Sequence, residues 1–223
     1  MNFITHTLRF LFFLLIIKPL VLIWIGLNTR RKELLPMDGP AVVVANHNSH
    51  LDTMVLINML PLSKLHKIRP VAAADYFMKN KLSAWFYLNI IGIIPIERGG
   101  AKAGNNPLEP CNLALERGEI LILFPEGTRS IRRQPLEFKL DAATVAIGSG
   151  VEILPIVIQC TPPTLAKHEL WYQIPPSRPF FSIQILPPTS LEELVPGDHN
   201  PRQPRRALHN TFLALLAPNP PLM

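Results

Sequence analysis

Short runs of consecutive apolar residues alternate with segments of helical spacing along most of the chain. The strand-like runs are 41–45 (AVVVA), 71–74, 91–96, 120–124 (ILILF) and 153–159. Helices are predicted between them over 51–60, 78–90, 110–117, which closes at Gly118, and 138–147. Strands that alternate with helices and are buried on both faces form parallel sheets. The pattern predicts an α/β fold, a mainly parallel mixed sheet flanked by helices, with 180–186 as a late edge strand.

The longest apolar stretch, 10–27, is interrupted only by Lys18 and Pro19. A lysine in the middle of a bilayer costs about 2.5–3.5 kcal/mol, and a proline kinks or breaks a helix. We therefore expect a pair of short helices that bend at these two residues and lie in one leaflet, with Lys18 reaching the headgroups. A single tilted span and a buried core helix are the alternatives. A cleavable signal peptide is disfavoured because no small-x-small site follows.

The basic cluster Arg30-Arg31-Lys32 ends this segment and predicts that the rest of the chain lies on the cytoplasmic side of the cell membrane. We thus divide the chain into a membrane-attachment segment, 1–32, and one globular domain, 33–223. The formal net charge of +6 suits anionic lipid or a phosphorylated substrate. Few aromatic residues interleave with the basic ones, so nucleic acid is not a predicted partner. The two cysteines form no CxxC pair, and no metal site is predicted.

Candidate chemistry begins where the strand 41–45 ends, at Asn46-His47-Asn48-Ser49-His50-Leu51-Asp52. A bend between His47 and Asp52 brings the imidazole and the carboxylate together, whereas a continuous helix would separate them by about 140°. The carboxylate would then fix the tautomer of His47, which would act as a general base. The alternative is structural, with Ser49 and Asp52 forming a capping box at a helix start. His50 is a second candidate base.

A second polar segment, Phe124 to Ser130 (FPEGTRS), follows the clearest predicted strand. Its glycine permits a close backbone approach, and its threonine, serine and arginine are donors suited to a phosphate. Composition alone also fits a solvated turn. The position of both polar segments, each directly after a buried strand, favours a site.

Four segments together resemble the ordered motifs of the glycerolipid acyltransferase superfamily, whose best-known members are 1-acyl-glycerol-3-phosphate acyltransferases. In chain order they are NHNSHLD at 46–52, GIIPIER at 92–98, FPEGTRS at 124–130 and VEILPIVI at 151–158. An isolated NHxxxxD pattern is weak evidence, whereas four motifs in the family's order are specific.

The resemblance implies a glycerol-phosphate acyltransferase fold whose N-terminal helices dock on the membrane. It makes His47 the general base and Asp52 its orienting partner, and it assigns the acceptor and its phosphate to Arg98, Glu126, Gly127, Thr128 and Arg129. The implied donor is an acyl-CoA or acyl-carrier-protein thioester, and the implied acceptor is lysophosphatidic acid, which becomes phosphatidic acid. No cofactor and no metal are expected.

Three other functions remain open at this point. The acceptor could be another lipid, such as a lysophospholipid or a lyso-ornithine lipid. The chain could be a non-catalytic protein that binds anionic lipid. A hydrolase with Ser49 or Ser130 as its nucleophile is disfavoured because the chain lacks the G-x-S-x-G motif.

Overall fold

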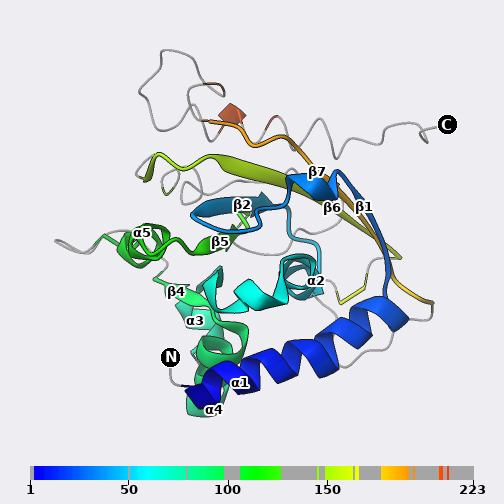
Figure 1. The fold of residues 1–223 in the computed structure, drawn as a ribbon, viewed down its shortest axis with the longest axis horizontal. Coiled ribbons are helices and arrows are strands. Elements are labelled where there is room, and N and C mark those ends of the chain that lie inside the picture. Colours follow the sequence, from blue (N-terminus) through cyan, green and yellow to red (C-terminus); the bar gives the residue numbers. More distant parts are fainter. Residues whose placement is uncertain are drawn as a thin grey trace.

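A seven-stranded sheet forms the centre of the protein (Figure 1), in the strand order β1-β7-β6-β2-β5-β3-β4. The computed structural model describes residues 3–49, 51–78, 80–97, 106–126, 145, 149–162, 164–165, 177–190, 193, 206–207 and 210. Within them the strands are β1 Gly26–Arg30, β2 Ala41–Ala45, β3 Ile68–Ala73, β4 Ile94–Ile96, β5 Ile120–Leu123, β6 Ile153–Thr161 and β7 Phe180–Ile185.

All neighbouring strands in this sheet are parallel except β6 and β7, which run antiparallel. The mainly parallel α/β fold predicted from the sequence is therefore confirmed. β2 lies at the centre of the sheet, between β5 and β6. Its five residues pair with β5 on one side and with β6 on the other. The position at which the following residues leave the sheet is therefore fixed by both neighbouring strands.

Helices cover both faces of the sheet. The α-helices are α1 Phe3–Phe12, α2 Leu51–Met59, α3 Ala74–Phe77, α4 Lys81–Phe86 and α5 Glu109–Glu116. Shorter turns are the π-helical η1 Phe13–Ile17, η2 Leu20–Trp24 and η5 Tyr87–Ile91, and the 3₁₀ η3 Lys32–Leu34 and η4 Leu62–Lys67. α1, α2 and α4 lie on one side of the sheet (Figure 1), and α5 packs against the other face.

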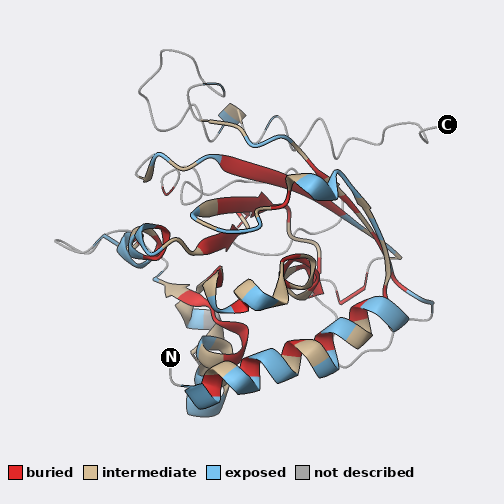
Figure 2. Ribbon diagram, in the orientation of Figure 1, coloured by how far each residue is buried: buried red, intermediate tan, exposed pale blue. Residues whose placement is uncertain are grey.

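The alternation of side chains along β2 explains its continuous apolar sequence. Val43 and Ala45 belong to the hydrophobic core under α1 and α2, whereas Val42 and Val44 belong to the core under α5. All four are buried, as the red central strands of Figure 2 show. A strand covered on both faces has no polar face, so its hydrophobic run is uninterrupted.

The far end of the sheet differs from the prediction. β7 was expected to be an edge strand, but β1 pairs with it in parallel, from Gly26 with Phe180 to Arg30 with Gln184. β1 is the edge strand. Its sequence, GLNTR, is too polar to be predicted as a strand from runs of apolar residues. Since β1 belongs to the sheet, the boundary expected at residue 32 falls after a strand of the globular domain. Of the helix expected over 138–147, the structure describes only Val145.

The predicted break at Lys18-Pro19 is wrong, because one helix runs from Phe3 to Trp24. Both residues have helical backbone angles. The wider π-helical turns η1 and η2 flank the proline, and the Lys18 N–H before it donates to Phe13 O within the helix. By length and composition, the helix could cross a membrane.

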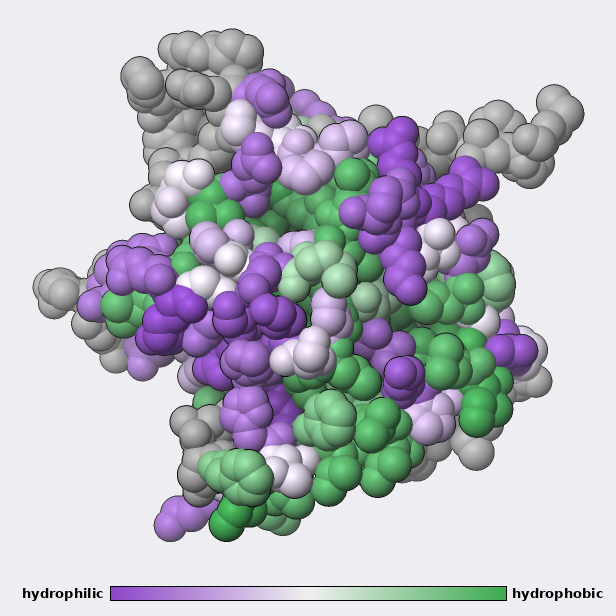
Figure 3. Space-filling model, viewed as in Figure 1, coloured by the Kyte–Doolittle hydropathy of each residue, from purple (hydrophilic) through white to green (hydrophobic). Residues whose placement is uncertain are grey.

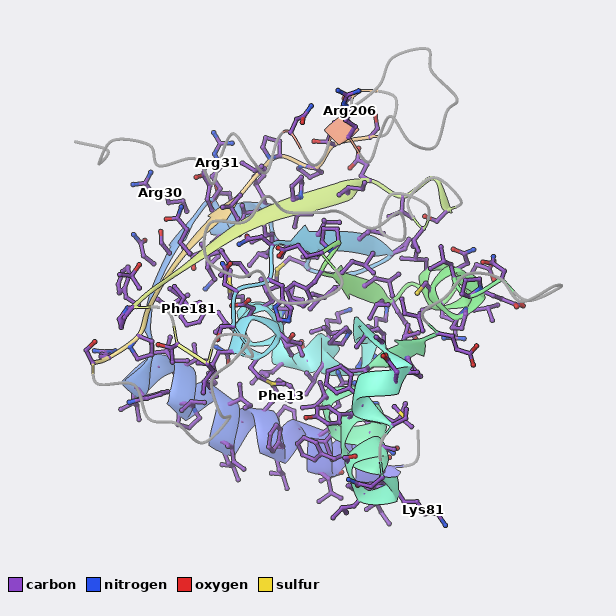
Figure 4. All side chains as sticks on the ribbon, turned by 180° about the vertical axis from the view of Figure 1, so that it is seen from behind. Phe13, Arg30, Arg31, Lys81, Phe181 and Arg206 are labelled. Atoms are coloured by element: carbon purple, nitrogen blue, oxygen red, sulfur yellow. The ribbon has the colours of Figure 1, made fainter. Side chains whose placement is uncertain are left out.

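One stripe of this N-terminal helix is buried on the domain. The stripe repeats every four residues and consists of Thr5, Arg9, Phe13, Ile17, Val21 and Ile25. Phe13 points from the helix into the interior (Figure 4). Large apolar side chains remain exposed on the rest of the helix, among them Phe3, Ile4, Leu15, Ile16, Leu22 and Ile23. They form the green lower edge of the molecule in Figure 3, and an exposed apolar surface of this extent indicates membrane association.

Candidate active site

The polar residues predicted to carry chemistry lie at the carboxyl ends of neighbouring parallel strands. Asn46 and His47 follow β2, and Phe124 and Glu126 follow β5. Parallel pairing places both chain ends at the same edge of the sheet, where α/β folds bind their ligands. α2 begins at this edge and brings Asp52 in its first turn.

Asp52 holds His47 through a bend in the chain, as predicted. Asp52 Oδ2 lies 3.0 Å from His47 Nδ1 and accepts hydrogen bonds from the backbone N–H groups of Asn48 (2.6 Å) and Ser49 (2.8 Å). The Asp52 side chain is fully buried, whereas that of His47 is 18% exposed. The contact orients the imidazole with its proton on Nδ1, so Nε2 is the nitrogen that can accept a proton.

The structural alternative for these residues is also correct. The Asp52 carboxylate reaches back to Ser49 N as in a capping box, while Ser49 Oγ accepts a hydrogen bond from Leu51 N, one residue before the usual donor. The same carboxylate thus caps α2 and binds His47. Ser49 Oγ also donates to the carbonyl of Thr164 and is buried, which assigns this hydroxyl to structure rather than to nucleophilic attack.

Asn46 fixes the loop to the neighbouring strand β6. Its Nδ2 donates to Ile158 O at 2.8 Å, and its Oδ1 accepts from Ile158 N at 2.7 Å. Asn48 Nδ2 donates to the same carbonyl at 2.8 Å. The Asn46 amide therefore continues the pairing of β2 with β6 by one residue after the backbone has turned away. Sequence reasoning missed this role, and the only signal was an amide directly after a buried strand.

Glu126 and Phe124 hold His47 from the other side. Glu126 Oε1 accepts a hydrogen bond from the backbone N–H of His47 at 2.7 Å, and Glu126 is buried. The ring of Phe124 stacks on the imidazole with 4.2 Å between centroids. Glu126 was predicted on the acceptor surface, which stays a prediction; its described contact is with the backbone of the loop that carries His47.

The other predicted acceptor residues, Arg98, Gly127, Thr128 and Arg129, lie outside the described residues, as does His50. The structure describes the residue before each of the two segments, Glu97 after β4 and Glu126 after β5. Both strands end at the same edge of the sheet as β2. Among the described residues, no group of three or more histidine, cysteine or acidic side chains is arranged to hold a metal ion.

Comparison with known proteins identifies the family to which the chain belongs. The family model described as Acyltransferase matches residues 26–159, more than half of the chain. The chain belongs to the acyltransferase family. The matched range contains β1 to β5 and most of β6, and it includes both His47 and Asp52.

Two curated relatives of this acyltransferase are both named as 1-acyl-sn-glycerol-3-phosphate acyltransferases. The chloroplastic 1-acyl-sn-glycerol-3-phosphate acyltransferase LPAT1 of Arabidopsis thaliana is 33% identical over 136 residues, 60% of this chain and 36% of the relative. The 1-acyl-sn-glycerol-3-phosphate acyltransferase alpha of Mus musculus is 29% identical over 188 residues, 83% of this chain and 62% of the relative. The chain thus spans between about a third and two thirds of these relatives.

A solved structure shares the fold of this acyltransferase. The crystal structure of PlsC, the 1-acyl-sn-glycerophosphate acyltransferase of Thermotoga maritima, matches with a TM-score of 0.65. The match covers 96% of this chain and 81% of that one, at 20% sequence identity. At this identity the likeness supports the α/β architecture only.

The support from Asn46 can be tested by a single change. Asn46→Asp replaces Nδ2 by an oxygen that faces Ile158 O inside the protein. An unpaired buried charge costs about 3–5 kcal/mol, so we expect the free energy of unfolding, measured with urea in detergent, to fall by that amount.

Asn89→Asp is the matched control. Asn89 Nδ2 donates to Trp85 O at 2.9 Å, but this bond is exposed. The control should change the free energy of unfolding by less than about 0.5 kcal/mol. Equal effects of the two substitutions would contradict the role assigned to Asn46.

Proposed function

We propose that this acyltransferase moves an acyl group from an acyl-CoA or acyl-carrier-protein thioester to the free hydroxyl of a lysophosphatidic acid, giving phosphatidic acid. The observation that carries the proposal is the buried Asp52 carboxylate, which two backbone N–H groups hold against His47 Nδ1. The names of the relatives support the choice of acceptor.

The reaction follows from the position of His47. Its Nε2 takes the proton of the acceptor hydroxyl while the oxygen attacks the thioester carbonyl carbon. Asp52 stabilises the imidazolium that forms, because the carboxylate lies 3.0 Å from Nδ1. When the carbon–sulfur bond breaks, the thiolate leaves and takes the proton from His47. The products are an ester and a thiol, and no acyl-enzyme is formed.

The stacked ring of Phe124 and the hydrogen bond from His47 N to Glu126 restrict the imidazole and its backbone. A base held in this way loses little rotational freedom when the acceptor binds. We assign recognition of the acceptor phosphate to Arg98 and Arg129, because arginine binds phosphate with two parallel hydrogen bonds. The proposed reaction requires no cofactor and no metal.

Substitution of the pair tests the mechanism. His47→Ala and Asp52→Asn should each lower the rate of acyl transfer by about 10²–10⁴-fold, because the general base is removed or misdirected. The rate is measured with labelled acyl-CoA and acyl-carrier-protein donors and lysophosphatidic acid as acceptor.

His66→Ala is the control for this test, because His66 is exposed on η4, at the opposite end of β3 from the site. It should leave the rate within about twofold of the unsubstituted enzyme, by analogy with other neutral surface changes. Activity that survives both His47→Ala and Asp52→Asn would refute the mechanism. Transfer to a lysophospholipid or a lyso-ornithine lipid but not to lysophosphatidic acid would refute only the acceptor.

We further propose that the N-terminal helix lies in the plane of the membrane on its cytoplasmic side. At 22 residues it is long enough to span a bilayer. A span, however, would remove the buried stripe from the domain and expose Arg9 to lipid, at about 2.5–3.5 kcal/mol for the arginine alone. An in-plane helix keeps the stripe buried and places the exposed apolar side chains in one leaflet.

This placement predicts which side chains bind lipid. The double substitution Leu15→Gln and Ile23→Gln changes two exposed positions of the helix. It should weaken binding to phosphatidylglycerol vesicles at least about tenfold, because each buried aliphatic side chain contributes roughly 1.5–3 kcal/mol. Cosedimentation measures the binding. Met37→Gln, an exposed position outside the helix, should bind as the unsubstituted protein does, and unchanged binding of the double variant would contradict the placement.

A further inference from the structure

Arg9 is a buried arginine in the membrane-docking helix, and the mechanism above does not use it. Only 1% of it is exposed, within a stripe that is otherwise largely apolar. Its Nη2 donates to Ile68 O at 2.8 Å and to Ile91 O at 3.0 Å, whereas among the described residues Nε and Nη1 donate no hydrogen bond. Burying a charge with so few hydrogen-bond partners costs free energy, so the burial of Arg9 calls for a functional explanation.

The two carbonyls that Arg9 binds mark the starts of two neighbouring strands. Ile68 is the first residue of β3, and Ile91 ends the helix that leads through Gly92 into β4. The carbonyl end of a helix carries a partial negative charge that stabilises a cation. Burial lowers the pKa of Arg9 to about 9, so the guanidinium keeps its charge at neutral pH. The charge of Arg9 therefore joins α1, β3 and the turn before β4.

Gly92 shows how closely the guanidinium lies on this turn. Gly92 has a φ of +80°, and a Cβ built on it would lie 2.6 Å from both Cζ and Nη2 of Arg9. Gly118 also has a positive φ, +69°, but the nearest atom to its Cβ would be 3.8 Å away. The two glycines share a backbone conformation, and only Gly92 also needs space for an arginine.

β4 depends on this support because it is weakly held. It has three residues, pairs only with β3 among the described strands, and contains Pro95, which has no N–H to donate. The chain leaves β4 through Glu97 toward Arg98, at the edge of the sheet where His47 lies. A three-residue strand spans only about 10 Å. A displacement of the backbone at Gly92 would therefore also displace the chain that leaves β4 on the acceptor side of the site.

We propose that Arg9 is a positioning residue that anchors the membrane helix to the start of β4 and thereby sets the acceptor side of the active site. This inference rests on the proposed function, because it takes the segment after β4 to bind the acceptor. Contact between Phe12 and Phe86, with ring centroids 5.5 Å apart, also connects α1 to α4, which precedes this turn. Movement of the docked helix at Arg9 would therefore act on acceptor binding.

Kinetics of Arg9→Met, which keeps much of the volume without the charge, tests this role. The KM for lysophosphatidic acid should rise about tenfold, with kcat and the KM for the acyl donor within about twofold. Arg9→Lys should recover part of the acceptor KM, because an ammonium can still bind a carbonyl. A merely structural role predicts equal effects on both substrates at a temperature well below unfolding, and that result would overturn the proposal.

A thermodynamic cycle tests the contact without any activity. Gly118→Ala should lower the Tm by about 2–8 °C through backbone strain alone. Gly92→Ala should lower it at least twice as much in the unsubstituted protein, but only as much as Gly118→Ala in the Arg9→Ala background. A Gly92→Ala effect that is the same in both backgrounds would overturn the contact.

Hydrogen exchange separates this inference from the proposed function. In Arg9→Met, the amides of residues 93, 94, 96 and 97 should exchange at least about tenfold faster, and those of 41–45 should not change. If the unsubstituted protein does not acylate lysophosphatidic acid but shows this difference, the proposed function fails and the anchoring by Arg9 is supported. If the enzyme is active and neither exchange nor the acceptor KM responds to Arg9→Met, the inference about Arg9 fails alone.

Discussion

The active-site loop is organised around one oxygen atom, Oδ2 of Asp52. This oxygen accepts hydrogen bonds from two backbone N–H groups and contacts His47 Nδ1, and its side chain is fully buried. A carboxylate without these partners would be too costly to bury. The first turn of α2 adds a favourable field, because a helix N-terminus stabilises negative charge. The chain between His47 and Ser49 therefore bends around the carboxylate, and the bend positions the imidazole.

The central strands hold this bend in place from three directions. β2 delivers the chain, the Asn46 amide pairs with Ile158 of β6, and Glu126 after β5 accepts from His47 N. Parallel neighbours end at one edge, so each strand can contribute a polar group without a long loop. The same geometry shows that capping and contact with His47 do not exclude one another. The Asp52 carboxylate does both, because the N–H groups that it caps belong to the loop that carries His47.

Sequence reasoning succeeded where a pattern depends on local burial. The runs AVVVA and ILILF predict strands because both of their faces are covered, and the motif beginning at Asn46 predicts that His47 meets Asp52. It failed where the outcome depends on distant partners. β1 is polar and is a strand only because β7 lies beside it, more than 150 residues later in the chain. Pro19 does not break the helix, which keeps helical backbone angles at Lys18 and Pro19 and packs one stripe on the domain. The role of Glu126 depends on a backbone N–H 79 residues away, which no local pattern reveals.

Arg9 shows the limit of hydropathy most clearly. Because residues 3–24 are so apolar, hydropathy alone would place Arg9 on the lipid-facing side of the helix, with its charged end reaching the headgroups. Its position on the helix places it on the buried face, since Arg9 lies four residues from both Thr5 and Phe13 of the buried stripe. Its partners are carbonyls 59 and 82 residues away, so its side chain faces the protein, away from the membrane. The same helix thus has exposed apolar side chains on one face and a buried charge that faces the sheet on the other. The proposed membrane docking requires only that the exposed face be apolar, whereas the buried face contacts one particular turn, at Gly92. We therefore expect substitutions on the two faces to separate membrane binding from acceptor binding.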